Sequence, residues 1–401
     1  MNSHSSRWQN CLLVAGILLV ALNLRPAVTS ISPLAERMRL DGLSRETIGS
    51  MTTIPLLLFG LVGLWAGWLG SRFGLARSLG AGLLVLGLGC FVRSVSGGDV
   101  IWLRLGGTVL IGTGIAMGNV LLPGLVKSRF PHHIGPMTSL YSTGMNLGAA
   151  FGFAAAVPLA NHLAGGWNAS LASWGVFAAV TLCLWIPQML PPPARHSGAR
   201  PLSGILQLVR QRRAWQVAIF MGLQSAVFYS SVSWLPTILQ YRGLSETTAA
   251  GWVTALQISG CVASLVVPTL AGRCESQSIW ILVCLLGNAI SIPCILYLPT
   301  AYAGVAVITL GLGVNSSFGL ALLLIALRSK DAGTAASLSS MAQAVGYLLA
   351  APGPWIVGWL SETTGGWPVA MGAVVAIALA AAVTGWFAGR PGEMRLMESA
   401  N

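Results

Sequence analysis

Charged side chains are scarce in this chain of 401 residues, which has 10 acidic residues and 22 lysines and arginines, together 8% of the sequence. Soluble globular domains carry about 25% charged residues, so this composition excludes an ordinary water-soluble protein. Apolar residues instead make up 55% of the chain. The composition therefore indicates an integral membrane protein.

Several chemical signatures are missing as well. The sequence has no GxxxxGK[ST] phosphate loop and no polar segment long enough to form a nucleotide-binding domain. The five histidines fall in predicted loops, the seven cysteines lack metal-ligand spacing, and no Ser/His/Asp cluster is evident. These absences argue against an enzyme, a metal site, a bound cofactor and the direct use of ATP by this chain.

Continuous apolar stretches are the main feature that is present. About twelve of them are long enough to cross a bilayer as an α-helix, and they lack the short alternating pattern of barrel strands. The longest polar segment contains LPPPARHSGARP and lies between two sets of six stretches. We therefore predict an all-α membrane protein with an N-terminal six-helix bundle (1–187), a central cytoplasmic loop (188–213) and a C-terminal six-helix bundle (214–401).

The positions of the basic residues predict the orientation in the membrane. Most lysines and arginines fall on the side that holds both termini, whereas the opposite face, to which we assign Arg93 and Arg104 near the ends of two predicted helices, has no net charge. The positive-inside rule then places both termini in the cytoplasm. Because the basic residues are dispersed through short loops, the partners that we expect are the lipid bilayer and a small-molecule substrate, and no nucleic acid.

The two halves share short motifs at a nearly constant offset. DGLSRET at 41–47 reappears as RGLSETT at 242–248, SLYS at 139–142 matches SLSS at 337–340, and Gly148 corresponds to Gly346. The common order of these matches predicts two six-helix pseudo-repeats. Membrane proteins built from two such halves bind their substrate between the halves and move by rocking.

The arrangement resembles the major facilitator superfamily over essentially the full length. The loop GWLGSRFGLAR at 67–77 is similar to the superfamily motif G-x-L-x-D-R-x-G-R, but Ser71 replaces its acid. The resemblance implies a gating role for this loop, and Ser71 puts the charge-paired latch of that motif in question. The motif positions are Gly67, Ser71, Arg72, Gly74 and Arg77.

More narrowly, four segments resemble the bacterial cyanate and 2-nitroimidazole transporter family. They are LNLRPAVTSISPL in the first helix, GNVLLPGLVKSRFP, AWQVAIFMGLQSAVFYSSVSWLP and MAQAVGYLLAAPGP. This resemblance implies a monomeric, multi-pass transporter in the bacterial inner membrane that moves a small anionic or planar polar solute by alternating access. It does not select the solute.

Arg25 lies deep inside the first predicted helix and is followed by Pro26. An arginine at that depth costs several kcal/mol if it faces lipid, so such residues usually face a protein interior or a wet cavity. Pro26 removes a backbone donor and disfavours helical geometry at Arg25, so we expect a local break there. We predict that Arg25 anchors the substrate; the alternative is a structural arginine that extends toward the headgroups.

Polar and aromatic residues at middle depth are the other candidates for substrate contact, since amides can hydrogen-bond a planar solute and aromatic rings can stack on it. Each could instead bridge two helices. The candidates are Asn23, Thr29, Asn119, Tyr141, Asn146, Gln224, Tyr229, Ser230, Trp234, Gln257, Asn315, Gln343 and Tyr347.

Two further questions stay open at this level. No carboxylate is expected inside the membrane, so transport is either uncoupled, an exchange, or coupled to protons through the substrate or through a rim acid such as Glu36. A proton-coupled multidrug or small-molecule efflux pump of the same fold is the alternative function. Such a pump would have a large apolar pocket and would not depend on Arg25.

Overall fold

The computed structural model describes residues 3–43, 45–95, 100–190 and 201–394. The described chain is helical throughout, apart from turns and one isolated bridge between Ser329 and Met394. It divides into two compact units, unit 1 (Met1–Leu125 and Gly144–Pro201) and unit 2 (Val126–Thr143 and Leu202–Asn401). Part of the predicted central loop, 191–200, lies outside the described residues.

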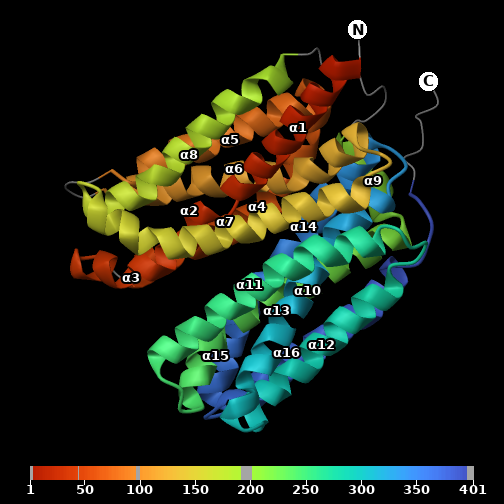
Figure 1. Ribbon diagram of the computed structural model, residues 1–401. Helices are drawn as coiled ribbons and strands as arrows, with labels where there is room; N and C mark the ends of the chain where they lie inside the picture. Colours follow the sequence, from red (N-terminus) through yellow and green to blue (C-terminus); the bar gives the residue numbers. More distant parts are fainter. Residues whose placement is uncertain (1–2, 44, 96–99, 191–200, 395–401) are drawn as a thin grey trace. The chain divides into compact units, whose positions relative to one another are not determined.

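Eight helices belong wholly or largely to unit 1, and Figure 1 shows them from red to yellow-green. They are α1 (Ser3–Asn23), α2 (Pro26–Thr29), α3 (Ile31–Leu40), α4 (Arg45–Phe73), α5 (Leu75–Arg93), α6 (Ile101–Arg129), α7 (Ile134–His162) and α8 (Gly166–Met189). The end of α6 and the first turns of α7 belong to unit 2.

The remaining helices form unit 2 (Figure 1). They are α9 (Pro201–Val209), α10 (Arg212–Tyr241), α11 (Glu246–Ala271), α12 (Ser278–Tyr297), the 3-10 turn η1 (Thr300–Tyr302), α13 (Ala303–Leu327), α14 (Ala332–Ala350), α15 (Gly353–Thr363) and α16 (Trp367–Ala388). The short helix α9 lies within the predicted central loop.

The lengths of the apolar helices account for the predicted spans. Ten described helices or helix runs are long and apolar enough to cross a membrane, and α4 adds an eleventh as a bent pair, Thr47–Gly63 and Trp65–Phe73. The remaining predicted span is the interrupted pair α14 and α15, whose serines, threonine and glutamine lower its hydropathy. Twelve predicted spans thus correspond to described helices, in agreement with the predicted fold class.

Equivalent contacts recur in the two units. The Arg77 side chain donates to the Met189 carbonyl over 3.0 Å, and the Gln277 backbone N–H donates to the Gly389 carbonyl over 2.9 Å. Gly148 packs on the backbone of Leu22, and Gly346 packs on Gly222. Both pairs of contacts are about 200 positions apart, so the repeat seen in the sequence is also a repeat of helix packing.

Candidate functional site

The first helix breaks where the sequence predicts. α1 ends at Asn23, and Arg25 is the N-terminal cap of α2 with φ −126° and ψ −39°. Pro26, which has no N–H to donate, occupies the first position of α2, and the next backbone bonds run from Val28 and Thr29 to the Arg25 carbonyl. The half-buried Arg25 side chain therefore starts from an irregular turn inside a span that extends from Cys11 to Ala35.

Glycines of α7 bring that helix onto the break. A Cβ atom on Gly152 would lie 2.6 Å from the Pro26 Cα atom, and one on Gly148 would lie 3.1 Å from the Leu22 carbonyl carbon. Both positions therefore require glycine for close helix packing. The Thr29 hydroxyl also donates to the Ala149 carbonyl over 3.0 Å, which fixes α2 against α7.

The predicted amides of unit 1 occupy different environments. Asn23 is buried and donates to the Thr181 hydroxyl over 2.8 Å, so it joins α1 to α8. Asn119 is also buried, and its neighbour Gly118 packs on Leu24 beside the break. Asn146 on α7 is half-buried. The structure thus gives Asn23 a helix-bridging contact and brings Asn119 near the broken turn.

An aromatic pair forms on α10 and α14 of unit 2. The rings of Tyr229 and Tyr347 have centroids 6.4 Å apart and are tilted by 56°. The helices approach closely because Gly222 faces Gly346, where an added Cβ would lie 3.1 Å from the opposing Cα atom. Gln343 is buried one turn before Tyr347. This crossing places two aromatic rings and an amide on neighbouring turns.

Gln224 lies two residues after Gly222 in α10 and is held in one orientation. Its Nε2 atom donates to the Met221 carbonyl over 3.0 Å and to the Ser225 hydroxyl over 2.8 Å. Its Oε1 atom is buried and has no hydrogen-bond partner among the described residues. That oxygen is an acceptor available to an N–H or O–H group.

The other predicted residues of unit 2 mostly contact neighbouring helices. Trp234 donates to the Pro354 carbonyl over 2.8 Å, and its ring lies 5.3 Å from that of Trp367. Ser230 is buried against Gly353, and Asn315 donates to the Gly311 carbonyl over 3.0 Å. Tyr141 is buried and Gln257 is half-buried.

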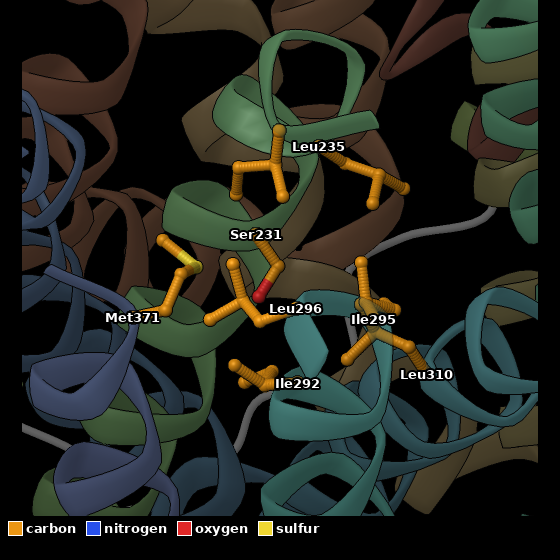
Figure 2. Close-up of a pocket in the computed structure, with 8 residues that line it drawn as sticks. Ser231, Leu235, Ile292, Ile295, Leu296, Leu310 and Met371 are labelled. Carbon is orange, nitrogen blue, oxygen red and sulfur yellow. The ribbon is translucent and has the colours of Figure 1, made fainter. Parts of the chain in front are cut away.

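An apolar pocket lies elsewhere in unit 2. Figure 2 shows the Ser231 hydroxyl among apolar side chains from α10, α12, α13 and α16. None of the predicted substrate-binding residues lines it. The lining residues are Ser231, Leu235, Ile238, Ile292, Ile295, Leu296, Leu310 and Met371. A charged solute could not pair with this lining, so the pocket does not match the predicted site.

In the motif at 67–77, Ser71 stands at the acidic position, and the neighbouring side chains make other contacts. The Ser71 hydroxyl donates to the Trp68 carbonyl of its own helix over 2.9 Å, and the Arg72 guanidinium lies 5.2 Å from the Trp68 ring centroid. Gly74 has φ +91°, a conformation that favours glycine. Gly67 is buried in α4. Arg72 thus contacts an aromatic ring from a motif in which Ser71 stands at the acidic position.

Sequence reasoning missed several contacts and the burial of two arginines. Thr181 and the Pro354 carbonyl, which hold Asn23 and Trp234, carry no local signal of that role. Arg93 and Arg104 were assigned to the face opposite the termini, and the structure buries both side chains, with exposed fractions of 0% and 7%. They lie in the last turn of α5 and the first turn of α6, where packing rather than hydropathy decides burial. The side chain of Glu36 lies outside the described residues.

Several known proteins are similar to this chain in sequence. The sequence profile of the Major Facilitator Superfamily matches residues 12–351. An uncharacterised transporter of Bacillus subtilis strain 168 is 39% identical over 96% of both chains. The 2-nitroimidazole transporter of Escherichia coli K12 is 37% identical, also over 96% of both chains, and the cyanate transport protein of the same strain is 26% identical over 87% of this chain and 90% of that one.

Solved structures show the same fold. The proton:xylose symporter XylE aligns with a TM-score of 0.77 at 13% identity, covering 94% of this chain and 95% of that one. The fucose:proton symporter FucP of Escherichia coli aligns with a TM-score of 0.74 at 15% identity, covering 94% and 99%. At these identities the likeness concerns the fold alone.

Proposed function

Because this chain belongs to the major facilitator superfamily, and is thus a transporter of small solutes and not an enzyme, we propose that it moves a small anionic or planar polar solute with Arg25 as the anchor. The transport cycle would be alternating access, as secondary active or facilitated transport. The single observation that carries the proposal is the position of Arg25 at a break inside the first span.

The depth of Arg25 supports this role. In the span from Cys11 to Ala35 it lies more than two helical turns from either end, farther from a span end than any other charged residue in the described spans. Charged residues at such depth are rare and mark substrate or ion pathways. A guanidinium has donors in a planar fork that matches carboxylate-like and other flat anions.

The relatives and the aromatic pair support a small flat solute. One relative is named for 2-nitroimidazole, a planar ring, and another for cyanate, a small anion. Tyr229, Tyr347, Gln343 and the free acceptor of Gln224 supply rings and hydrogen-bonding groups on one helix crossing. Aromatic faces and amides together suit planar polar solutes better than a purely apolar drug.

We extend the proposal to the setting of the protein. The basic loops favour cytoplasmic termini in a bacterial inner membrane, and a monomer follows the superfamily pattern. The loop at 67–77 would contribute to gating through Arg72 and Arg77. Within the described spans no acid lies as deep as Arg25, which favours uncoupled transport, exchange, or proton coupling through the substrate or a rim acid such as Glu36.

Thermal shift of the purified protein tests the anchor. Wild type, Arg25→Ala and Arg25→Lys would be compared across cyanate, nitrate, small carboxylates and 2-nitroimidazole. Arg273→Ala is the matched control, because Arg273 is an exposed arginine after α11. We expect one ligand class to stabilise the wild type and the control but neither Arg25 variant.

Two results would contradict the proposal. Binding that survives Arg25→Ala would make Arg25 a structural or gating residue and would favour the efflux alternative. Absence of any shift in the wild type, together with stabilisation by bulky apolar compounds, would reject the proposed solute class.

A further inference from the structure

α9 is an amphipathic helix whose two faces differ in exposure. Leu208 is fully buried, and Gly204, four residues earlier on the same face, is buried as well. Leu206 and Val209 lie three residues apart on another face, with exposed fractions of 61% and 41%. One face of α9 therefore packs on the protein, and the other presents apolar side chains to its surroundings.

The C-terminal end of α9 is fixed to the first turn of α10. The Trp215 indole N–H donates to the Val209 carbonyl over 2.8 Å. Between the two helices, the Gln211 backbone N–H donates to the Leu208 carbonyl over 2.8 Å. Arg210 and Gln211 therefore join α9 to α10 in a hydrogen-bonded turn.

The junction also fixes the depth of α9. The membrane span of α10 begins at Arg212, just after α9 ends at Val209. Trp215, in the first turn of that span, is 38% exposed, and tryptophan is enriched where acyl chains meet headgroups. α9 therefore lies at the membrane–water boundary, where an exposed apolar helix face can be buried among the outer parts of the acyl chains.

Basic side chains flank this apolar face. Arg210 directly follows α9 and Arg212 starts α10, and both are exposed. The segment 188–213 contains five arginines and no acid, and the nearest acids along the chain are Asp99 and Glu246. A basic segment beside an apolar helix face is typical of helices that bind an anionic membrane surface.

We propose that α9 lies in the headgroup region and binds anionic phospholipid. Leu206 and Val209 insert among the acyl chains, and Arg210 and Arg212 pair with lipid phosphates. Arginine suits this role because its planar fork of donors matches a phosphate group. A second copy of this chain fits the surface less well, because it would place a second set of arginines against the first.

Hydrogen–deuterium exchange of the full-length protein in nanodiscs tests the contact at α9 itself and does not depend on the transported solute. Discs of phosphatidylcholine with increasing phosphatidylglycerol would be compared for wild type, Arg210→Gln, Arg212→Gln and the double variant Leu206→Ser/Val209→Ser. Arg273→Gln is the control, because Arg273 is exposed after α11. We expect phosphatidylglycerol to slow amide exchange in α9 and the following turn of wild type and control. Half of that effect should require about fivefold more phosphatidylglycerol in each glutamine variant, the contribution of one basic residue near an anionic surface.

The variants also separate the apolar and the charged contributions. In Leu206→Ser/Val209→Ser the protection by phosphatidylglycerol should be lost, and in wild type a rise from about 0.05 M to about 0.5 M salt should remove it, because exposed charges are screened. Equal exchange in the two kinds of disc, or equal responses of wild type and both glutamine variants, would overturn the proposal. Protection that survives in the serine variant would overturn it too, since another part of the protein or a second copy would then cover this face.

Discussion

Gly148 of α7 packs directly on the carbonyl group of Leu22 in α1, one turn before the break at Arg25. A Cβ atom at position 148 would also lie 3.2 Å from the Leu22 Cα atom, so the two backbones are in contact. The same relationship holds between Gly346 and Gly222 in unit 2. In each unit a glycine of one helix therefore fixes how closely a helix of the proposed site can approach.

We expect Gly148→Ala to destabilise the protein by about 1–3 kcal/mol, because the methyl group meets backbone atoms that cannot rotate away. The control is Gly106→Ala, since a Cβ at position 106 of α6 meets nothing within 4 Å. Alanine is a better helix former than glycine, so the control should melt at the same temperature or higher. Melting curves in detergent would measure both, and equal loss in the two variants would contradict the packing argument.

The bond between Asn23 and Thr181 predicts a structural rather than a substrate-binding role for Asn23. A double-mutant cycle with Asn23→Ala and Thr181→Val should give a coupling of about 0.6 kcal/mol, typical of such bonds inside membranes. The half-saturation concentration for transport should stay within about threefold in each variant, because about 0.6 kcal/mol corresponds to a factor of about three. Zero coupling with a large loss of substrate affinity would return Asn23 to the substrate site.

The helix break was predictable because its cause is local. Pro26 acts on the residue before it and on the preceding turn, whatever the rest of the chain does. The pseudo-repeat was predictable for a similar reason, since Gly148 and Gly346 appear in the sequence at a near-constant offset. Both predictions rest on residue types whose geometry is fixed by the backbone.

Burial at the helix ends was not predictable in the same way. Arg93 and Arg104 lie near the ends of two predicted helices, where the sequence does not decide burial, and contacts between helices, such as that of Gly107 with the Arg93 backbone and that of Arg104 with Trp167, help to bury them. Thr181 is 158 residues from Asn23, so the local sequence around either residue does not predict their hydrogen bond. The packing partners of a candidate residue decide whether it joins two helices or remains available to a substrate. Hydropathy and motif spacing do not identify those partners.

The aromatic pair predicts a difference between ring-containing and linear solutes. Tyr347→Phe keeps the ring beside Tyr229, whereas Tyr347→Leu removes it. If a planar aromatic solute such as 2-nitroimidazole binds there, Tyr347→Leu should weaken its binding by about 0.5–1.5 kcal/mol, the usual contribution of an aromatic contact. Binding of cyanate should change less than about twofold, because a linear anion makes no such stacking contact.

A competition assay between 2-nitroimidazole and cyanate would measure the affinity for both solutes on one preparation of each variant. Tyr302→Leu is the control, because Tyr302 is exposed in the turn before α13. A uniform loss for both solutes in Tyr347→Leu would indicate a packing defect, and an unchanged 2-nitroimidazole affinity would remove Tyr347 from the site.

Arg328 gives the strongest stability prediction in unit 2. It follows α13, is 5% exposed, and donates through Nη2 to the Gly389 carbonyl over 2.7 Å and to Gln277, and through Nε to the Ala388 carbonyl over 3.2 Å. Burial, with a smaller effect from the charge of Arg213, lowers the pKa of Arg328 to about 10. The side chain therefore remains a cation at neutral pH and ties the end of α13 to those of α12 and α16.

Replacement of this cation removes one donor from each of three acceptors, of which the Gly389 carbonyl still accepts from the Gln277 backbone N–H. We expect Arg328→Ala to lower the free energy of unfolding by about 1.5–3 kcal/mol, the usual contribution of hydrogen bonds to a charged group. Arg390→Ala should cost less than about 1 kcal/mol, because Arg390 is exposed and its guanidinium lies over the Phe387 ring, 4.9 Å from the ring centroid.

The pH dependence provides an independent check on Arg328. Its folded pKa lies below the ordinary value of an arginine, so the folded state releases this proton before the unfolded state does as the pH rises. The contribution of Arg328 to stability is then constant below pH 10 and rises between the two pKa values. The melting-temperature difference between wild type and Arg328→Ala should therefore stay constant from about pH 6 to about pH 8, and a difference that changes by half across that range would show that another group titrates with the network.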